Sequence, residues 1–232
     1  MFKNAGQHEK VIRALATKRV GLVRGELLKA AKLESGGGSS DILRELEEAG
    51  FISLSVPLGK ARKDALYRLD DEYSLFYLTW IATVRTSSKN PWITLCNSPK
   101  YRSWAGYAFE NVCLKHVEGI KKALGIAGMQ TTHASWHHRP KSQSDRGTQI
   151  DLLIDRSDRC INLCEMKFSI GEFTIDKRYA RDLENKRTVF QRVTGTRKTI
   201  FMTMVTSNGL KQNQYSKQLV DSEFTADVLF DS

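Results

Sequence analysis

Several features that mark whole classes of protein are absent from this sequence of 232 residues. No stretch approaches 18 consecutive apolar residues, which excludes a membrane-spanning helix. Residues 1–10 lack the apolar core of a secretory signal, so a cytoplasmic protein is expected. No G-x-x-x-x-G-K-[ST] motif occurs, which excludes nucleotide hydrolysis through a P-loop. The four cysteines include no C-x-x-C pair, and we expect them to be reduced thiols.

Basic residues outnumber acidic ones. Lys and Arg total 36 against 26 Asp and Glu, which gives a formal net charge of +10. A surplus of this size favours polyanionic partners, DNA above all, because basic side chains neutralise phosphates and release counterions. A generically basic globular protein is the alternative, since the 41% hydrophobic and 27% charged residues are an ordinary globular balance.

Residues 1–70 have the pattern of three helices followed by a β-hairpin. The third helix is expected to begin at Ser39 or Ser40 and to end at Gly50. Alternating apolar residues then predict strands at 51–56 and 65–69. This order predicts a winged-helix domain.

The third helix of that domain is poorly suited to DNA. It carries four carboxylates and one basic residue, Arg44, and phosphates would repel such a helix. The hairpin loop is better suited to phosphates because it carries Lys60, Arg62 and Lys63. A winged helix that contacts a protein is therefore favoured over one that reads a DNA sequence, with the loop as the predicted nucleic-acid contact.

The remainder of the chain predicts a linker and an α/β domain. Residues 71–99 are expected to form a linker helix and loop, with Asp70 or Asp71 capping the helix. Residues 100–232 predict a mixed sheet flanked by helices. The expected elements of this domain are helices at 104–124 and 175–193 and strands at 147–155, 160–168 and 198–205.

Two carboxylates and a lysine are expected to meet on one hairpin of this sheet. A turn centred on Asp158 places Asp151 directly opposite Glu165. Lys167 lies two residues further along the strand, so its side chain projects from the same face. A slip of one residue in register would destroy this arrangement.

Facing carboxylates repel each other unless a cation lies between them or one of them is protonated. Mg²⁺ or Mn²⁺ is the natural occupant because both prefer oxygen ligands. Glu110 lies on an apolar flank of the helix at 104–124, where it is costly to bury unless it is paired or bound to metal. We therefore expect this helix to bring Glu110 to the same metal. A surface ion cluster in which Lys167 balances two carboxylates is the alternative.

The motifs at these residues resemble the PD-(D/E)XK superfamily of metal-dependent nucleases. Thirteen residues separate Asp151 from Glu165-Met166-Lys167, and a helix with Gly106-Tyr107-Ala108-Phe109-Glu110 precedes them. Residues 104–168 are similar to the nuclease-like C-terminal region, preceded by a winged helix, of prokaryotic (archaeal-type) AAA ATPases. Ile150 stands where the superfamily has proline. Since the ATPase core of those proteins is missing here, the resemblance suggests a fragment, a split gene or a trimmed protein.

The resemblance implies a restriction-endonuclease-like fold in which Asp151, Glu165 and Glu110 bind the metal and Lys167 is the catalytic lysine. The expected activity is Mg²⁺-dependent or Mn²⁺-dependent hydrolysis of DNA phosphodiester bonds. A non-catalytic module that binds DNA or a partner ATPase is the alternative.

The second long helix of the α/β domain is rich in basic residues. Lys177 and Arg181 are four positions apart, so they share one face of the helix. A groove for a polyanion and a solvated charged face both remain open interpretations. The six bases of this helix are Lys177, Arg178, Arg181, Lys186, Arg187 and Arg192.

Overall fold

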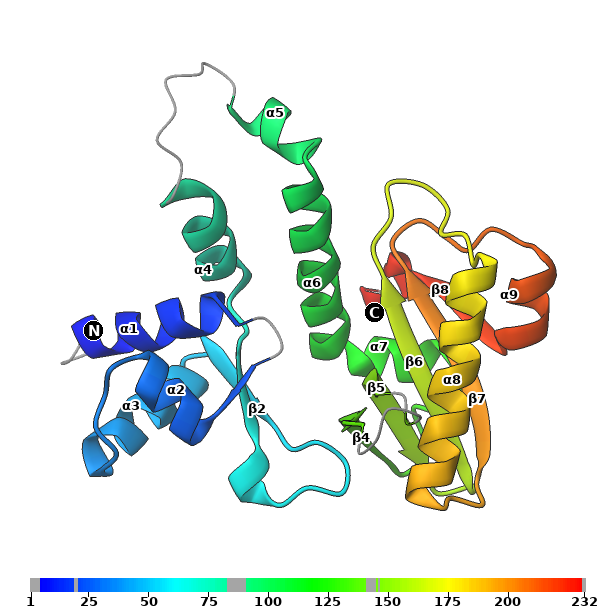
Figure 1. The fold of residues 1–232 in the computed structure, drawn as a ribbon, viewed down its shortest axis with the longest axis horizontal. Coiled ribbons are helices and arrows are strands. Elements are labelled where there is room, and N and C mark those ends of the chain that lie inside the picture. Colours follow the sequence, from blue (N-terminus) through cyan, green and yellow to red (C-terminus); the bar gives the residue numbers. More distant parts are fainter. Residues whose placement is uncertain (1–4, 19–20, 83–90, 141–144, 146, 231–232) are drawn as a thin grey trace. The chain divides into compact units, whose positions relative to one another are not determined.

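The computed structural model describes residues 5–18, 21–82, 91–140, 145 and 147–230 of a mixed α/β chain (Figure 1). The chain divides into two compact units, Met1–Pro91 (unit 1) and Trp92–Ser232 (unit 2). This division falls inside the predicted linker at 71–99. Residues 83–90, which include most of the predicted linker loop, lie outside the described part of the chain. No helix in the described ranges is long and apolar enough to cross a bilayer.

Unit 1 combines helices with a small antiparallel sheet of order β1-β3-β2. Strand β3 pairs with both of its neighbours, and the predicted hairpin of β2 and β3 is present. Asp71 caps α4 by accepting a hydrogen bond from the Ser74 amide, at 2.7 Å. The elements of unit 1 are α1 (Ala5–Ala16), β1 (Leu22–Val23), α2 (Arg24–Ala30), α3 (Gly37–Glu48), β2 (Ile52–Ser55), the 3₁₀ turn η1 (Arg62–Asp64), β3 (Leu66–Leu69), α4 (Glu72–Phe76) and a π-helical turn η2 (Tyr77–Ile81).

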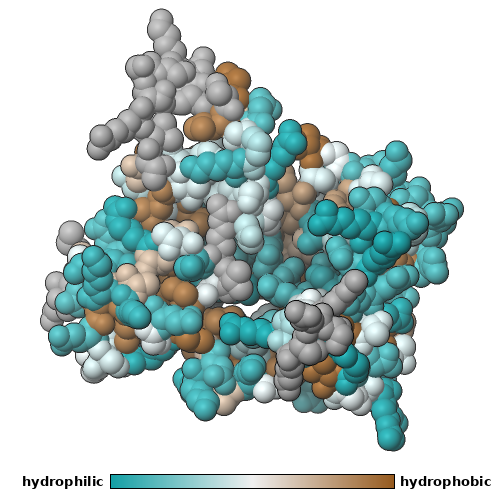
Figure 2. All heavy atoms as spheres, viewed as in Figure 1, coloured by the Kyte–Doolittle hydropathy of each residue, from teal (hydrophilic) through white to brown (hydrophobic). Residues whose placement is uncertain are grey.

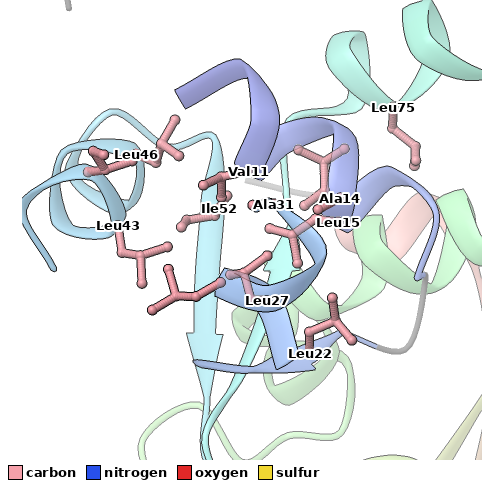
Figure 3. Packing of buried hydrophobic residues seen from close by; sticks show 13 residues of the cluster. Val11, Ala14, Leu15, Leu22, Leu27, Ala31, Leu43, Leu46, Ile52 and Leu75 are labelled. Carbon is pink, nitrogen blue, oxygen red and sulfur yellow. The ribbon is translucent and has the colours of Figure 1, made fainter. Parts of the chain in front are cut away.

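The core of unit 1 is made by the apolar faces of α1, α2 and α3 against the sheet (Figure 3). Val11 and Leu27 are fully buried in it. Helix α3 begins earlier than predicted: its N-cap is Gly36, and the Ser39 hydroxyl accepts a hydrogen bond from the Gly36 amide. The helix ends as predicted, because Gly50 has a φ of 74°, a left-handed conformation that favours glycine.

Unit 2 contains a five-stranded sheet of order β4-β5-β6-β7-β8. Strand β5 pairs antiparallel with both β4 and β6. Strand β7 pairs parallel with both β6 and β8. The elements of unit 2 are α5 (Pro91–Cys96), α6 (Pro99–Lys115), α7 (Val117–Ala123), β4 (Thr131–His138), β5 (Thr148–Arg156), β6 (Cys160–Lys167), α8 (Lys177–Thr194), β7 (Thr199–Thr206), α9 (Gln214–Leu219), β8 (Ser222–Thr225) and η3 (Ala226–Leu229).

Helices cover both faces of this sheet. Cys113 of α6 and Ile120 of α7 share a core with Leu152 of β5 and Cys164 of β6. Helix α8 lies over the opposite face (Figure 1), where Phe190 packs edge-on against Trp136 of β4 with ring centroids 5.1 Å apart. The single helix predicted at 104–124 is wrong. His116 leaves the helical conformation, with φ −105° and ψ 33°, and divides α6 from α7.

Candidate active site

The hairpin of β5 and β6 has the register predicted from the sequence. Leu152 pairs with Cys164 and Asp155 pairs with Ile161, which is the register that sets Asp151 against Glu165. Among the described strand residues, however, the β5–β6 pairing ends at Leu152 and Cys164. Beyond that point β6 continues to Lys167 while paired with β7. The two strands therefore separate at the position of the two carboxylates.

A β-bulge accompanies this separation. On the other side of β5, Ala134 pairs with Leu153 and Trp136 pairs with Ile150. Two steps along β4 thus match three steps along β5, so β5 carries one extra residue at Asp151 or Leu152. Bulges of this kind redirect a side chain and are common beside active sites. Because of this bulge, the direction of the Asp151 side chain does not follow from simple strand alternation.

Glu165 is the centre of a buried polar cluster. The residue is 1% exposed, and it lies on the face of β6 opposite the buried Cys164. Its Oε1 accepts a hydrogen bond from Lys186 Nζ at 2.5 Å, and its Oε2 accepts one from the Tyr179 hydroxyl at 3.1 Å. Lys167 Nζ lies 3.5 Å from Oε2. The sequence pattern predicted neither contact from α8: Lys186 was expected only as one of the bases of this helix, and Tyr179 was not expected at the site.

Helix α8 places these two donors two turns apart. Tyr179 and Lys186 are seven residues apart, so they lie on the same side of the helix as Leu183 and Phe190. Leu183 and Phe190 are buried against the sheet. A lysine within such an apolar stripe is a signal in the sequence that could have identified Lys186 as a partner of the strand carboxylates.

Asp151 belongs to the same cluster and is 8% exposed. Gln149 Nε2 donates a hydrogen bond to its Oδ1 at 3.0 Å. Burial raises the pKa of the Asp151 carboxyl, and the nearby Glu165 charge raises it further. Lys186 and Lys167 oppose this increase because their positive charges favour the ionised carboxylate. Burial also raises the pKa of the Tyr179 hydroxyl, and the Glu165 charge adds to this effect, so Tyr179 remains a hydrogen-bond donor.

Glu110 comes from a different element, the helix α6. It lies one turn before Cys113. Burial raises the pKa of the Cys113 thiol, and the Glu110 charge raises it further. Cys113 packs with Cys164 on the face of the sheet that α6 and α7 cover, whereas Asp151 and Glu165 face α8. Among the described residues, no three His, Cys, Asp or Glu side chains are close enough to hold a metal. The described part of the chain therefore does not group Glu110 with Asp151 and Glu165 as three metal ligands, and a role of Glu110 as a metal ligand stays a prediction.

The six bases of α8 have different environments. Lys177, Arg178 and Arg181 are exposed on the first turns of the helix, and the visible surface above α8 and α9 is mostly hydrophilic (Figure 2). The other three contact groups of unit 2 itself. Lys186 binds Glu165, Arg187 donates to the Ile200 carbonyl, and Arg192 pairs with Asp145.

Two carboxylates on a sheet fit Mg²⁺ or Mn²⁺, because these ions are commonly bound by one or two carboxylates together with water and substrate phosphates. Besides burial, repulsion from the Glu165 charge raises the pKa of Asp151, and a bound cation would relieve this repulsion. Comparison of the chain with known protein families gave no match, and no match was found among curated proteins or solved structures. The geometry of the site therefore carries the functional argument.

Proposed function

We propose that this chain is a divalent-metal-dependent nuclease that hydrolyses DNA phosphodiester bonds, with Asp151, Glu165 and Lys167 as its active-site residues. One observation carries the proposal: two nearly buried carboxylates and a partly exposed lysine meet where β5 and β6 separate. Burying two like charges side by side is costly, and such costs are typical of functional sites.

Four groups of the cluster have a role in this reaction. Asp151 and Glu165 would hold the cation, which when bound polarises a phosphoryl oxygen and acidifies a water molecule. The Lys167 ammonium, with its side chain 29% exposed, is placed to stabilise negative charge that develops on the phosphate oxygens. The Tyr179 hydroxyl fixes Glu165 by its hydrogen bond to Oε2. Exposed Lys177, Arg178 and Arg181, together with the hairpin-loop residues Lys60, Arg62 and Lys63, are the proposed contacts to DNA phosphates.

A non-catalytic module is the second candidate, and a specific contact favours it. Lys186 already binds Glu165 at 2.5 Å, and Lys167 lies near the same carboxylate. Two lysines thus match two carboxylates without a metal. In this case the fold would serve as a scaffold that binds DNA or a partner ATPase, and residues 1–70 would serve as a winged-helix contact to a protein.

Metal binding and cleavage separate the two candidates. We expect millimolar Mn²⁺ or Mg²⁺ to raise the melting temperature of the wild type, because a ligand that binds only the folded state stabilises it. The Asp151→Asn variant should lose this increase, and it should also lose cleavage of plasmid DNA.

Lys167→Met provides the matched variant. An ammonium group cannot bind a metal ion, so this variant should keep the thermal response to Mn²⁺ and lose cleavage. Equal thermal responses in wild type and Asp151→Asn, with no plasmid cleavage, would show that the carboxylates are structural and would favour the module.

A further inference from the structure

Unit 1 contains a pocket of about 520 Å³ between α3 and the hairpin formed by β2 and β3. Four basic residues line it: Arg24 at the start of α2, Arg44 on α3, and Arg62 and Lys63 in the η1 turn. Glu47 is the one carboxylate among the lining residues. Cations that converge on one pocket repel each other, and an anion bound there would relieve this repulsion.

Arg24 is fixed in position by neutral groups. Its Nη2 donates to the Ser40 hydroxyl at 2.9 Å, and its Nη1 donates to the Ser35 hydroxyl at 3.1 Å. Within the described ranges, no carboxylate forms an ion pair with Arg24, Arg62 or Lys63. The guanidinium of Arg24 is thus held in place while its charge remains available to a ligand.

Arg44 differs from the other three cations. It pairs with Asp41 at 2.8 Å on the exposed surface of α3. Its charge is therefore partly balanced, and we assign the main attraction to Arg24, Arg62 and Lys63.

The size and the apolar part of the pocket indicate more than a bare ion. Leu43, Leu54 and Ala65 contribute apolar surface to the lining, beside the Tyr67 side chain. Pockets for small organic ligands usually measure about 300–1,000 Å³, and this pocket falls in that range. An inorganic phosphate would leave most of the apolar lining uncovered, whereas the organic part of a phosphate ester would cover it.

We propose that this pocket binds the phosphate group of a phosphate ester, which comes either from a free nucleotide or from a nucleic-acid strand. The proposal does not depend on the nuclease site at Asp151 and Glu165, since every lining residue lies in unit 1, although Arg62 and Lys63 are also among the proposed contacts to DNA phosphates. The pocket is also distinct from the set of basic residues in the hairpin loop. Arg24 of α2 lines the pocket, whereas Lys60 of the loop does not.

The test compares two double variants of the full chain. Arg62→Glu/Lys63→Glu reverses two charges in the pocket, and Lys10→Glu/Lys29→Glu reverses two exposed charges of unit 1 outside it. The probes are adenosine 5′-monophosphate, followed by calorimetry, and a fluorescent single-stranded oligodeoxythymidine, followed by anisotropy. EDTA is present throughout to prevent cleavage. Because all four residues are exposed, both variants should fold, which far-UV circular dichroism checks.

We expect the pocket variant to bind at least one probe about tenfold more weakly than the control variant, since charge-assisted contacts to phosphate are lost. A selective loss of adenosine monophosphate binding identifies a free nucleotide as the source of the phosphate. A selective loss of oligonucleotide binding identifies a nucleic-acid strand. The proposal is overturned if the wild type binds neither probe, or if both variants weaken binding equally.

Discussion

Opposing effects act on the pKa of the buried Asp151 carboxyl. Burial and the Glu165 charge raise its pKa, while Lys186 and Lys167 oppose them without cancelling the increase. A carboxyl whose pKa is higher in the folded state binds its proton more tightly there. The free energy of unfolding should therefore fall as pH rises from the unfolded pKa of about 3.9 through the raised folded value.

Asp151→Asn should remove this penalty. We expect the variant to be more stable than the wild type at pH 8 in EDTA, with the difference shrinking as pH falls toward 4. Urea unfolding across this range measures the difference. A variant that is less stable than the wild type at pH 8 would contradict the assigned direction.

Asp158 provides a control of opposite sign. It is exposed, and the hydrogen bond from Arg156 lowers the pKa of its carboxyl. A lowered folded pKa stabilises the protein above the unfolded pKa, and this stabilisation disappears as pH falls through the folded value. Asp158→Asn should therefore be the less stable protein at neutral pH, and its deficit should disappear in acid.

Among the elements of unit 2, α7 makes an unusually close approach to η3. A Cβ atom added at Gly119 would lie 2.5 Å from the Val228 carbonyl oxygen and 3.2 Å from the Leu229 Cα. Both obstacles are backbone atoms, so no side-chain rotation relieves the clash. The absence of a side chain at residue 119 thus allows the C-terminal turn to pack on α7.

Gly119→Ala should lower the free energy of unfolding by about 1–3 kcal/mol through overpacking. Gly106→Ala in α6 is the matched control, because a Cβ atom there meets nothing within 4 Å. The control should gain about 0.5–1 kcal/mol, since alanine favours a helix interior over glycine. Urea unfolding of both variants checks the pair, and a neutral or stabilising effect at Gly119 would contradict the close packing.

At the scale of the whole molecule, the net charge of +10 predicts DNA binding that depends on salt far more than on sequence. The exposed bases Lys177, Arg178 and Arg181 of α8 are expected to supply part of this binding. Lys177→Glu/Arg181→Glu should weaken binding to every duplex tested and should reduce the slope of log affinity against log salt by about 2. Anisotropy titrations in EDTA between about 50 and 200 mM salt measure both quantities.

Lys211→Glu/Lys217→Glu is the control for that experiment. It makes the same change in net charge at exposed positions of unit 2 outside α8. If this control loses as much affinity as the α8 variant, the binding reflects net charge and α8 has no special role. An affinity that salt does not change would contradict phosphate binding altogether.

Features that depend on local geometry could be predicted from the sequence alone. Strand alternation and the length of the turn at Asp158 set the register of β5 and β6, and the structure confirms that register. Helical periodicity located α8 and its apolar stripe to within two residues at its start and one at its end. These predictions succeed because neighbouring residues alone fix the direction of each side chain.

The groups that meet across elements could not be predicted in this way. The packing of unit 2 brought Tyr179 and Lys186 of α8 onto the Glu165 carboxylate, and among the described residues it did not group Glu110 with Asp151 and Glu165 as three metal ligands. It also introduced the bulge at Asp151, which depends on the pairing with β4, a strand that the sequence pattern did not predict. The physical reason is that local periodicity shows which side of a helix is apolar, whereas the packing of the whole unit decides which face of the sheet that side covers.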